Sequence, residues 1–280
     1  MRNKHHHDFR IVKSSGQPES FSKKKLIQSI KRTSLPKRQC EHIANEVTHD
    51  IGEGVKTSDI YRKTLRLVRQ TSSLAGAQYS LKRAIFELGP TGHHFETFVA
   101  RYFEELCFKT KTCQTFKGRW VSHEIDVVAL SRGEKYFVEC KFHNRIGIKN
   151  DIKTALYVKA RWDDLKAGPV GHDLTGFYLA SNTAFSLDAI KYAAGTGLRL
   201  LGINAPSEMS FLDHIKQLNL YPITSLKSLD RTTKRILIEE GIILVKDLNR
   251  KVDMLYKLGF SSTDIKLIQG ELNILSKGIL

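Results

Sequence analysis

Two strand-like runs joined by a short turn limit the fold of this 280-residue chain more than any other feature. They cover residues 124–130 and 135–142, are rich in β-branched and aromatic residues, and flank Ser131-Arg132-Gly133-Glu134. This pattern predicts a β-hairpin. Because strand side chains alternate between faces, Glu139 and Lys141 share one face. The runs are too apolar for a wholly exposed hairpin, so we expect this charged pair in a mostly buried sheet, where unpaired charge is costly and usually functional.

Asp126 lies on the first strand, thirteen positions before Glu139, and no other Glu in the chain has a Lys two positions later. Two carboxylates suit a hard divalent cation such as Mg²⁺ or Mn²⁺, which takes oxygen ligands and activates water. Lys141 would orient or deprotonate that water. The alternative is a solvated strand face on which the charges have no such task.

Helices and strands are predicted on both sides of the hairpin. Apolar residues at helical spacing predict a helix over residues 92–106. Downstream, Asn150 or Asp151 caps a helix to about Leu165, and a strand (175–180), a helix from about Leu187 and a strand (198–203) follow. Strands separated by helices predict an α/β sheet covered on both faces.

The stretch from Gly92 to Pro206 resembles the Mrr-like restriction endonucleases of the PD-(D/E)xK nuclease superfamily. The residues that carry the resemblance are Gly92, Phe95 and Glu96, then Asp126, then Glu139-Cys140-Lys141. The resemblance implies a restriction-endonuclease-like α/β core that cleaves DNA. It also implies that Asp126 and Glu139 bind the metal, that Lys141 serves the nucleophilic water, and that Glu96 contributes from its helix. Glu124 lies on the same strand face as Asp126 and competes with it as a ligand.

Three further residues are candidate substrate contacts. His143 follows Lys141 on the same face if the strand continues, and Lys153 and Tyr157 lie at helical spacing on the next helix. In the superfamily that this stretch resembles, that helix often supplies polar groups near the scissile phosphate. A plain solvated helix face explains Lys153 and Tyr157 equally well.

The first ninety residues predict a separate domain. Residues 9–13 and 18–21 predict a short hairpin, Ser22 caps a helix, and further helical patterns begin near Lys37, Thr57 and Leu74. This order resembles the ATP-cone, a nucleotide-binding regulatory domain, which implies ATP or dATP as a ligand. The positions that match its contacts are Val12, Lys13, Lys25, Tyr79, Lys82 and Arg83. The alternative is a helical bundle whose lysines only face water.

Charge and composition fit this division. The net charge is +16, and residues 1–89 carry 18 Lys and Arg against 8 Asp and Glu. Such a surplus attracts nucleotide and the DNA backbone. The four cysteines form no Cys-x-x-Cys pair, which disfavours a zinc ribbon. With no run of eighteen apolar residues and no secretory segment, we expect a cytoplasmic protein without a membrane partner.

The sequence therefore predicts a multidomain α and α/β chain. The expected parts are a disordered tail (1–8), an ATP-cone (9–89), a PD-(D/E)xK nuclease domain (90–206) and a helical C-terminal module (207–280). Glycine-separated short helices in the last part resemble helix-hairpin-helix or sterile-alpha-motif-like modules, and a packing or homo-oligomer role fits them as well. The expected function is a nucleotide-regulated, Mg²⁺-dependent DNA endonuclease of the restriction or defence type. The alternative is an inactive nucleotide-sensing DNA-binding regulator.

Overall fold

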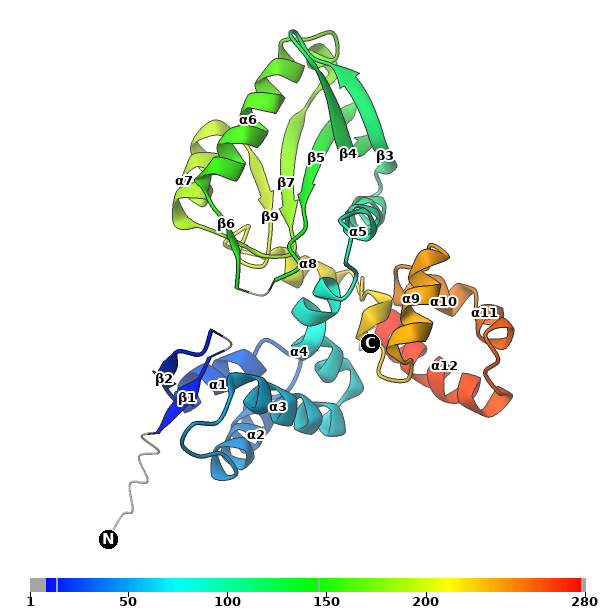
Figure 1. The fold of residues 1–280 in the computed structure, drawn as a ribbon. Helices are drawn as coiled ribbons and strands as arrows, with labels where there is room; N and C mark the ends of the chain where they lie inside the picture. Colours follow the sequence, from blue (N-terminus) through cyan, green and yellow to red (C-terminus); the bar gives the residue numbers. More distant parts are fainter. Residues whose placement is uncertain (1–8, 14, 146, 278–280) are drawn as a thin grey trace. The chain divides into compact units, whose positions relative to one another are not determined.

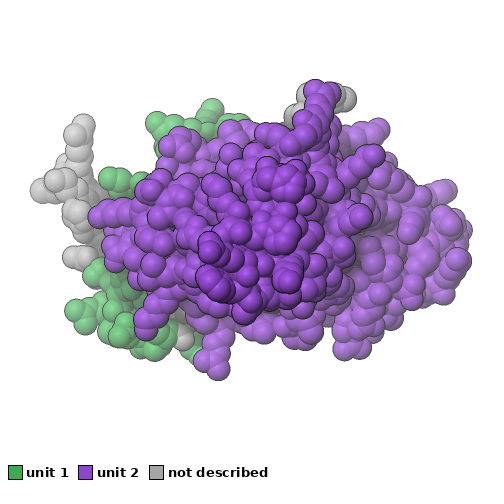
Figure 2. Space-filling view, turned by 90° about the horizontal axis from the view of Figure 1, so that it is seen from above, with its two compact units in different colours: residues 1–81, 278–280 green, residues 82–277 purple. Residues whose placement is uncertain are grey.

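The computed structural model describes residues 9–13, 15–145 and 147–277 (Figure 1). The tail expected over residues 1–8 lies outside the described residues. Contacts within the chain divide it into two compact units, with the boundary between Leu81 and Lys82 (Figure 2). The structure is mixed α and β, which confirms the coarse fold class that the sequence predicted.

The first unit contains a helical bundle and a small hairpin. The hairpin pairs β1 (Arg10–Val12) antiparallel with β2 (Pro18–Ser20), and α1 (Lys23–Ile30), α2 (Lys37–His49), α3 (Thr57–Thr71) and the start of α4 (Ser73–Phe86) follow. Ser22 caps α1, since its side chain accepts a hydrogen bond from the Lys25 N–H at 3.3 Å. Ile30, Ala44 and Val68 are fully buried in a core shared by the hairpin and the helices.

The second unit is built on a five-stranded sheet in the order β3-β4-β5-β7-β9. Its strands are β3 (Lys109–Lys117), β4 (Ser122–Ser131), β5 (Glu134–Lys141), β7 (Gly176–Ser181) and β9 (Arg199–Leu201). The first three strands pair antiparallel, and β7 and β9 pair parallel to β5 and to each other. Parallel neighbours require a crossover connection, which here contains a helix in both cases.

The predicted hairpin turns through Arg132 and Gly133, whose φ angles are 42° and 86°. A two-residue loop with positive φ at both positions is a type I′ turn, whose twist matches that of the strands. Glycine adopts this conformation without a steric cost from a Cβ atom. The turn fixes the register, so that Ser131 pairs with Glu134 and Val127 with Val138.

Helices cover both faces of this sheet, as predicted (Figure 1). On one face, α5 (His93–Glu105) packs against β3, β4 and β5. On the other, α6 (Ile152–Lys166) and α7 (Leu187–Thr196) share a core with Phe137 and Phe177, which are fully buried. Asp151 and Ser186 cap α6 and α7 by accepting hydrogen bonds from backbone N–H groups at 3.3 and 3.2 Å. A two-stranded parallel sheet, β6 (Lys149–Asn150) with β8 (Ala184–Phe185), and the 3-10 turn η1 (Gly171–Asp173) lie in the connections.

Short helices complete the second unit. They are α8 (Phe211–Gln217), the 3-10 turn η2 (Ile223–Ser225), α9 (Arg231–Glu239), α10 (Val245–Arg250), α11 (Asp253–Lys257) and α12 (Ser262–Lys277). Two ion pairs join α10 to α5: Arg101 with Asp247 at 3.4 Å and Lys246 with Glu105 at 2.8 Å. The α10 helix therefore contacts α5, the helix that carries Glu96.

Besides the two-residue strands β6 and β8 and the 3-10 turns, two elements were missing from the sequence prediction. β3 reads Lys-Thr-Lys-Thr-Cys-Gln-Thr-Phe-Lys, with too few apolar residues to indicate a strand. It lies at the edge of the sheet, where lysines suit a strand that has one neighbour. The seven-residue helix α8 also escaped notice, although Ser210 and Asp213 form a capping box at its start.

Candidate functional site

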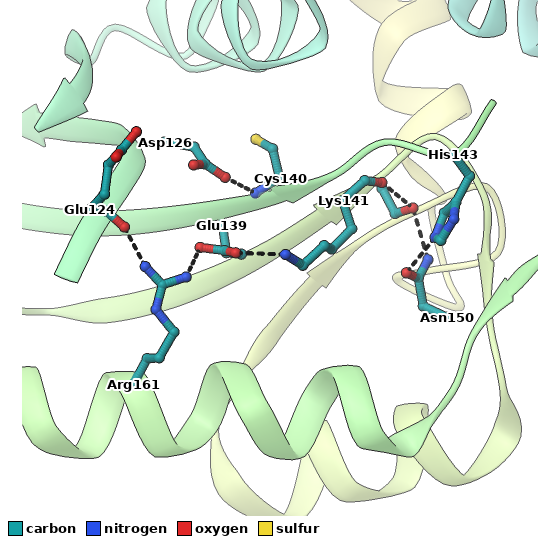
Figure 3. A network of polar contacts seen from close by, with 9 residues as sticks. Glu124, Asp126, Glu139, Cys140, Lys141, His143, Asn150 and Arg161 are labelled. Carbon is teal, nitrogen blue, oxygen red and sulfur yellow. Dashed lines mark hydrogen bonds and ion pairs between the residues drawn. The ribbon is translucent and has the colours of Figure 1, made fainter. Parts of the chain in front are cut away.

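The hairpin strands β4 and β5 separate at the predicted carboxylates. Their pairing begins at Ser131 with Glu134 and ends at Val127 with Val138, so Asp126 and Glu139 lie just beyond the last pair. The β5 strand nevertheless stays paired with β7 as far as Lys141. One Asp126 carboxylate oxygen accepts a hydrogen bond from the Cys140 N–H at 2.6 Å (Figure 3). Asp126 thus occupies the gap left by the missing ladder pair.

The backbone also departs from regular geometry on the other side of Asp126. In β3, Thr112 pairs with Val127 and Gln114 with Ile125, so Cys113 lies across from Asp126. Cys113 has a φ of 52°, a left-handed conformation that non-glycine residues rarely adopt. Strained backbone of this kind is concentrated at functional sites.

Asp126 lies in an environment that disfavours its negative charge. Burial first, and then the charge of Glu139, raise the pKa of this carboxyl from 3.8 to about 7, while the hydrogen bond from the Cys140 N–H opposes the shift. Glu96 on α5 acts in the same direction as Glu139. Within the described residues, no Lys or Arg forms an ion pair with Asp126, Glu96 or Glu124. A cation would relieve this repulsion, because an opposite charge favours the ionised form.

Glu139 has a different environment on the side of α6. Its side chain is 6% exposed and forms ion pairs with Lys141, at 2.9 Å, and with Arg161 of α6. Arg161 also donates a hydrogen bond to the backbone oxygen of Glu124, so it joins β4, β5 and α6 (Figure 3). The predicted Glu139–Lys141 pair is therefore present, and Arg161 is a third member that the sequence analysis did not include.

The predicted substrate contacts have distinct surroundings. Tyr157 is 57% exposed, and the Lys141 Nζ and Arg161 Cζ atoms lie 5.9 and 5.6 Å from its ring centroid. Lys153 is exposed one helical turn earlier on α6. His143 is held by Asn182, which accepts from its backbone N–H at 2.9 Å, and by Asn150, 2.9 Å from its Nε2 atom. The structure thus brings Tyr157 next to Lys141, whereas His143 lies past the end of β5 in a polar network with Asn150 and Asn182.

Glu96 contacts a second pair of possible metal ligands. His93 Nδ1 lies 3.5 Å and Cys113 Sγ 3.9 Å from the same Glu96 oxygen. Among the described residues, these three form the group whose ligand atoms all lie within 4.8 Å of one another. Asp126 and Glu139 are not members of such a compact group, because Glu139 is turned toward Arg161.

The predicted nucleotide contacts fall in two places. Lys13 and Lys25 meet at Glu19, with Nζ to carboxylate distances of 2.8 and 2.5 Å. Hydrogen bonds from these two lysines lower the pKa of Glu19 to about 2. Val12 contributes backbone pairing to the same hairpin, while Tyr79 stacks on Tyr61 with ring centroids 5.5 Å apart. The two remaining predicted contacts lie beyond the unit boundary, on α4: Lys82, and Arg83, which pairs with Glu87 at 3.1 Å.

Sequence reasoning did not assign Arg161 or Cys113 to the site, although Arg161 shares the helical spacing of Lys153 and Tyr157. Arg161 lies four residues after Tyr157 and eight after Lys153, so its helical spacing was the available signal. Cys113 gave no signal, because its conformation depends on the pairing of a strand that the sequence did not reveal. No helix among the described residues has both the length and the apolar character that a membrane crossing requires.

The fold and site define a mixed α/β protein with carboxylates at the opening of a central hairpin. A family model described as "AF1548-like, C-terminal" matches residues 221–276. An uncharacterized protein from Archaeoglobus fulgidus is 34% identical over 174 residues, which are 62% of this chain and 97% of that protein. A crystal structure titled as a protein of unknown function, AF1548, has a TM-score of 0.54 and 33% identity, covering 68% of this chain and all of its own. The chain therefore belongs to the AF1548-like family.

Proposed function

We propose that this chain is a nucleotide-regulated, divalent-metal-dependent DNA endonuclease of the restriction or defence type. In this proposal residues 90–206 form a nuclease core of the PD-(D/E)xK kind, residues 9–89 an ATP-cone, and residues 207–280 a small helical module. The observation that carries the proposal is the separation of β4 from β5 at Asp126 and Glu139, directly before Lys141.

The residues at this opening fit a hard divalent cation. Asp126 is half-buried, has a pKa raised to about 7, and forms no ion pair with Lys or Arg among the described residues. Asp126 and Glu139 would hold Mg²⁺ or Mn²⁺, with Glu96 in support from α5 and Glu124 as the competing ligand. When bound, such an ion neutralises charge on the attacked phosphate and makes a water more acidic.

The protein's own groups supply the remaining chemistry. The Lys141 nitrogen lies 2.9 Å from Glu139, where its ammonium form would orient a water and its neutral amine form would receive the proton of that water. Arg161 holds Glu139 in place and adds a second positive charge for the phosphate backbone. Exposed Lys153 and Tyr157 on α6 line the approach to Lys141 and would contact the DNA strand.

A plasmid cleavage assay tests the enzymatic part. We expect the full-length protein to nick or cut DNA in Mg²⁺ or Mn²⁺ but not in EDTA. Asp126→Ala and Lys141→Ala should each lower the rate at least about 100-fold, the scale of a positioned catalytic group. Asp253→Asn, an exposed carboxylate change on α11, serves as the control. Cleavage that persists in both site variants would refute the assignment.

One observation favours the binding-only alternative, a catalytically inactive DNA-binding regulator. Lys141 and Arg161 already compensate the charge of Glu139, which leaves Asp126, Glu96 and Glu124 as the carboxylates of the site that form no ion pair with Lys or Arg among the described residues. The assay separates the two functions. DNA binding without cleavage in Mg²⁺, Mn²⁺ or added nucleotide would support the regulator.

The nucleotide role rests on the convergence of Lys13 and Lys25. Both ammonium groups contact Glu19 and remain 45% and 71% exposed, so a triphosphate can replace the carboxylate as their partner. The start of α1 adds backbone N–H groups that favour anions. We expect calorimetry to detect ATP or dATP binding to the full-length chain, and the double change Lys13→Ala/Lys25→Ala to weaken it at least about tenfold. Lys37→Ala on α2 is the control. If the double variant bound ATP or dATP as tightly as Lys37→Ala does, a nucleotide site at Lys13 and Lys25 would be excluded.

A further inference from the structure

The connection between β3 and β4 exposes the most accessible aromatic side chain of the described residues. This β3–β4 tip consists of residues 118–121, and its Trp120 is 77% exposed beside Val121, which is 58% exposed. The other tryptophan of the chain, Trp162, is 8% exposed in the core beneath α6. Burying an aromatic side chain of this size is strongly favourable, so its exposure needs an explanation.

Hydrogen bonds within the turn and to Asp164 of α6 hold the backbone of the tip in place. Gly118 N–H donates to the Val121 carbonyl at 2.8 Å, which closes the turn. The Asp164 carboxylate accepts from the Trp120 N–H at 2.9 Å, the Val121 N–H at 3.3 Å and His123 Nε2 at 2.8 Å. The Arg119 N–H donates to the Asp164 carbonyl at 3.0 Å. One residue of α6, Asp164, therefore fixes four positions around the exposed ring.

Two glycines permit this close packing. A Cβ atom on Gly118 would overlap the Asp164 carboxylate, and one on Gly168 would lie 2.6 Å from the Gly118 backbone. With any residue other than glycine at these two positions, the Cβ atom would prevent the tip from approaching the end of α6 this closely. A rigid backbone lowers the entropic cost of using the exposed side chain in recognition.

The charges at the tip favour a polyanion. The Arg119 guanidinium lies 5.0 Å from the Trp120 ring centroid, and Lys117 is exposed at the end of β3. Both oxygens of Asp164 accept inward hydrogen bonds, which weaken the repulsion between this carboxylate and an approaching anion. An exposed indole with an arginine on its face matches the way that proteins stack nucleobases and contact the adjacent phosphate.

The tip is connected to the candidate site by one strand. Trp120 and Asp126 are six residues apart on β4 and its turn, which corresponds to at most roughly 20 Å. Stacked nucleotides rise about 3.4 Å each, so this separation spans roughly four to six nucleotides.

We propose that Trp120 stacks on an unpaired or easily unstacked base of the DNA substrate, about four to six nucleotides from the phosphate at Asp126. The tip then selects DNA that carries a bulge, a mismatch or a single-stranded segment at that distance. The choice of DNA rests on the proposed function, but the contact itself needs neither metal nor cleavage.

Fluorescence tests the contact in EDTA, where no cleavage occurs. The full-length protein is titrated with an intact duplex and with the same duplex carrying a one-nucleotide bulge. We expect the bulged duplex to quench the emission of Trp120, and Trp120→Ala to lose that quenching while Trp162 still emits. Affinity for the bulged duplex should fall roughly 5- to 100-fold in Trp120→Ala, the range for a stacked base, and Trp120→Phe should retain most of it. Leu267→Ala changes an equally exposed apolar residue on α12, 71% exposed, and is the control.

The outcomes separate this inference from the nuclease proposal. Equal affinity of Trp120→Ala and Leu267→Ala for the bulged duplex would overturn it, even if Asp126-dependent cleavage were found. A blue shift of Trp120 with anionic lipid vesicles and no response to DNA would also overturn it. Quenching by bulged DNA without cleavage in any metal would keep the inference and refute only the nuclease. Because Trp120 is 77% exposed, its replacement should leave the fold intact.

Discussion

Replacing Asp126 by asparagine should stabilise the metal-free protein at alkaline pH. The carboxyl titrates near pH 7 instead of 3.8 because it is buried beside Glu139 and Glu96. The folded state therefore holds a proton that the unfolded chain has released. The resulting stabilisation is fully present below about pH 3.8 and is lost as the pH rises through about 7. Above that pH the fold contains an ionised, poorly solvated carboxylate.

The magnitude follows from the size of the shift. A change from 3.8 to about 7 is roughly three pKa units, and each unit corresponds to about 1.36 kcal/mol. The largest gain in the free energy of unfolding is thus on the order of 4 kcal/mol. Because part of the pKa shift is shared with Glu139, we expect Asp126→Asn to gain about 2 to 4 kcal/mol at pH 8. Asparagine keeps an oxygen that accepts from the Cys140 N–H, which is 2.6 Å from the native carboxylate. The gain should shrink to roughly 1 to 2 kcal/mol at pH 5, where the native carboxyl is neutral but the unfolded carboxyl, about 1.2 pH units above its pKa of 3.8, is mostly ionised.

Urea unfolding in EDTA measures this difference. Trp162 reports on the second unit, because it packs in the core between the sheet and α6. Full-length protein, Asp126→Asn and the control Asp253→Asn are compared at pH 5 and pH 8. A gain for Asp126→Asn that is the same at both pH values, or no larger than that of the control, would refute the electrostatic reasoning. The result does not depend on whether the chain is a nuclease.

Three further outcomes follow from the same contacts. Mg²⁺ should raise the melting temperature more at pH 8 than at pH 6, because protons compete for Asp126 below about pH 7. If Mg²⁺ raised the melting temperature of Asp126→Asn by the same amount, Asp126 would be excluded as a metal ligand. Arg161→Ala should lower the free energy of unfolding by about 1 to 3 kcal/mol in urea titrations, since Glu139 keeps only Lys141 as a partner, and Arg161→Lys should lose less. Asp164→Ala should lower the free energy of unfolding by about 1 to 3 kcal/mol, because it leaves N–H groups of the β3–β4 tip without an acceptor. Hydrogen exchange at the Trp120 N–H should become faster. Unchanged exchange would contradict a tip that is fixed by Asp164.

Most of the helices and strands could be predicted from the sequence, because the residue patterns that indicate them are local. The β4–β5 hairpin follows from two apolar runs around Arg132-Gly133, and the structure places the turn at these residues. The α1 cap, Ser22, was likewise predicted from residue type and position, and the α6 cap, Asp151, was one of the two residues predicted for it, with Asn150. In contrast, β3 was missed because its alternating Lys and Thr residues suit an edge strand, and only its pairing with β4 makes it a strand.

The sequence by itself determined which charged residues lie on the hairpin and that Glu139 and Lys141 share a face. Strand periodicity alone requires this, and their 2.9 Å ion pair confirms it. The tertiary structure decided where the ladder opens, that Arg161 from a helix 22 residues away neutralises Glu139, and that Asp126 has no such partner among the described residues. These features depend on long-range packing, since burial and the approach of distant charges set the pKa of a carboxylate. The spacing of residues in the sequence predicts neither the burial of a carboxylate nor the approach of distant charges.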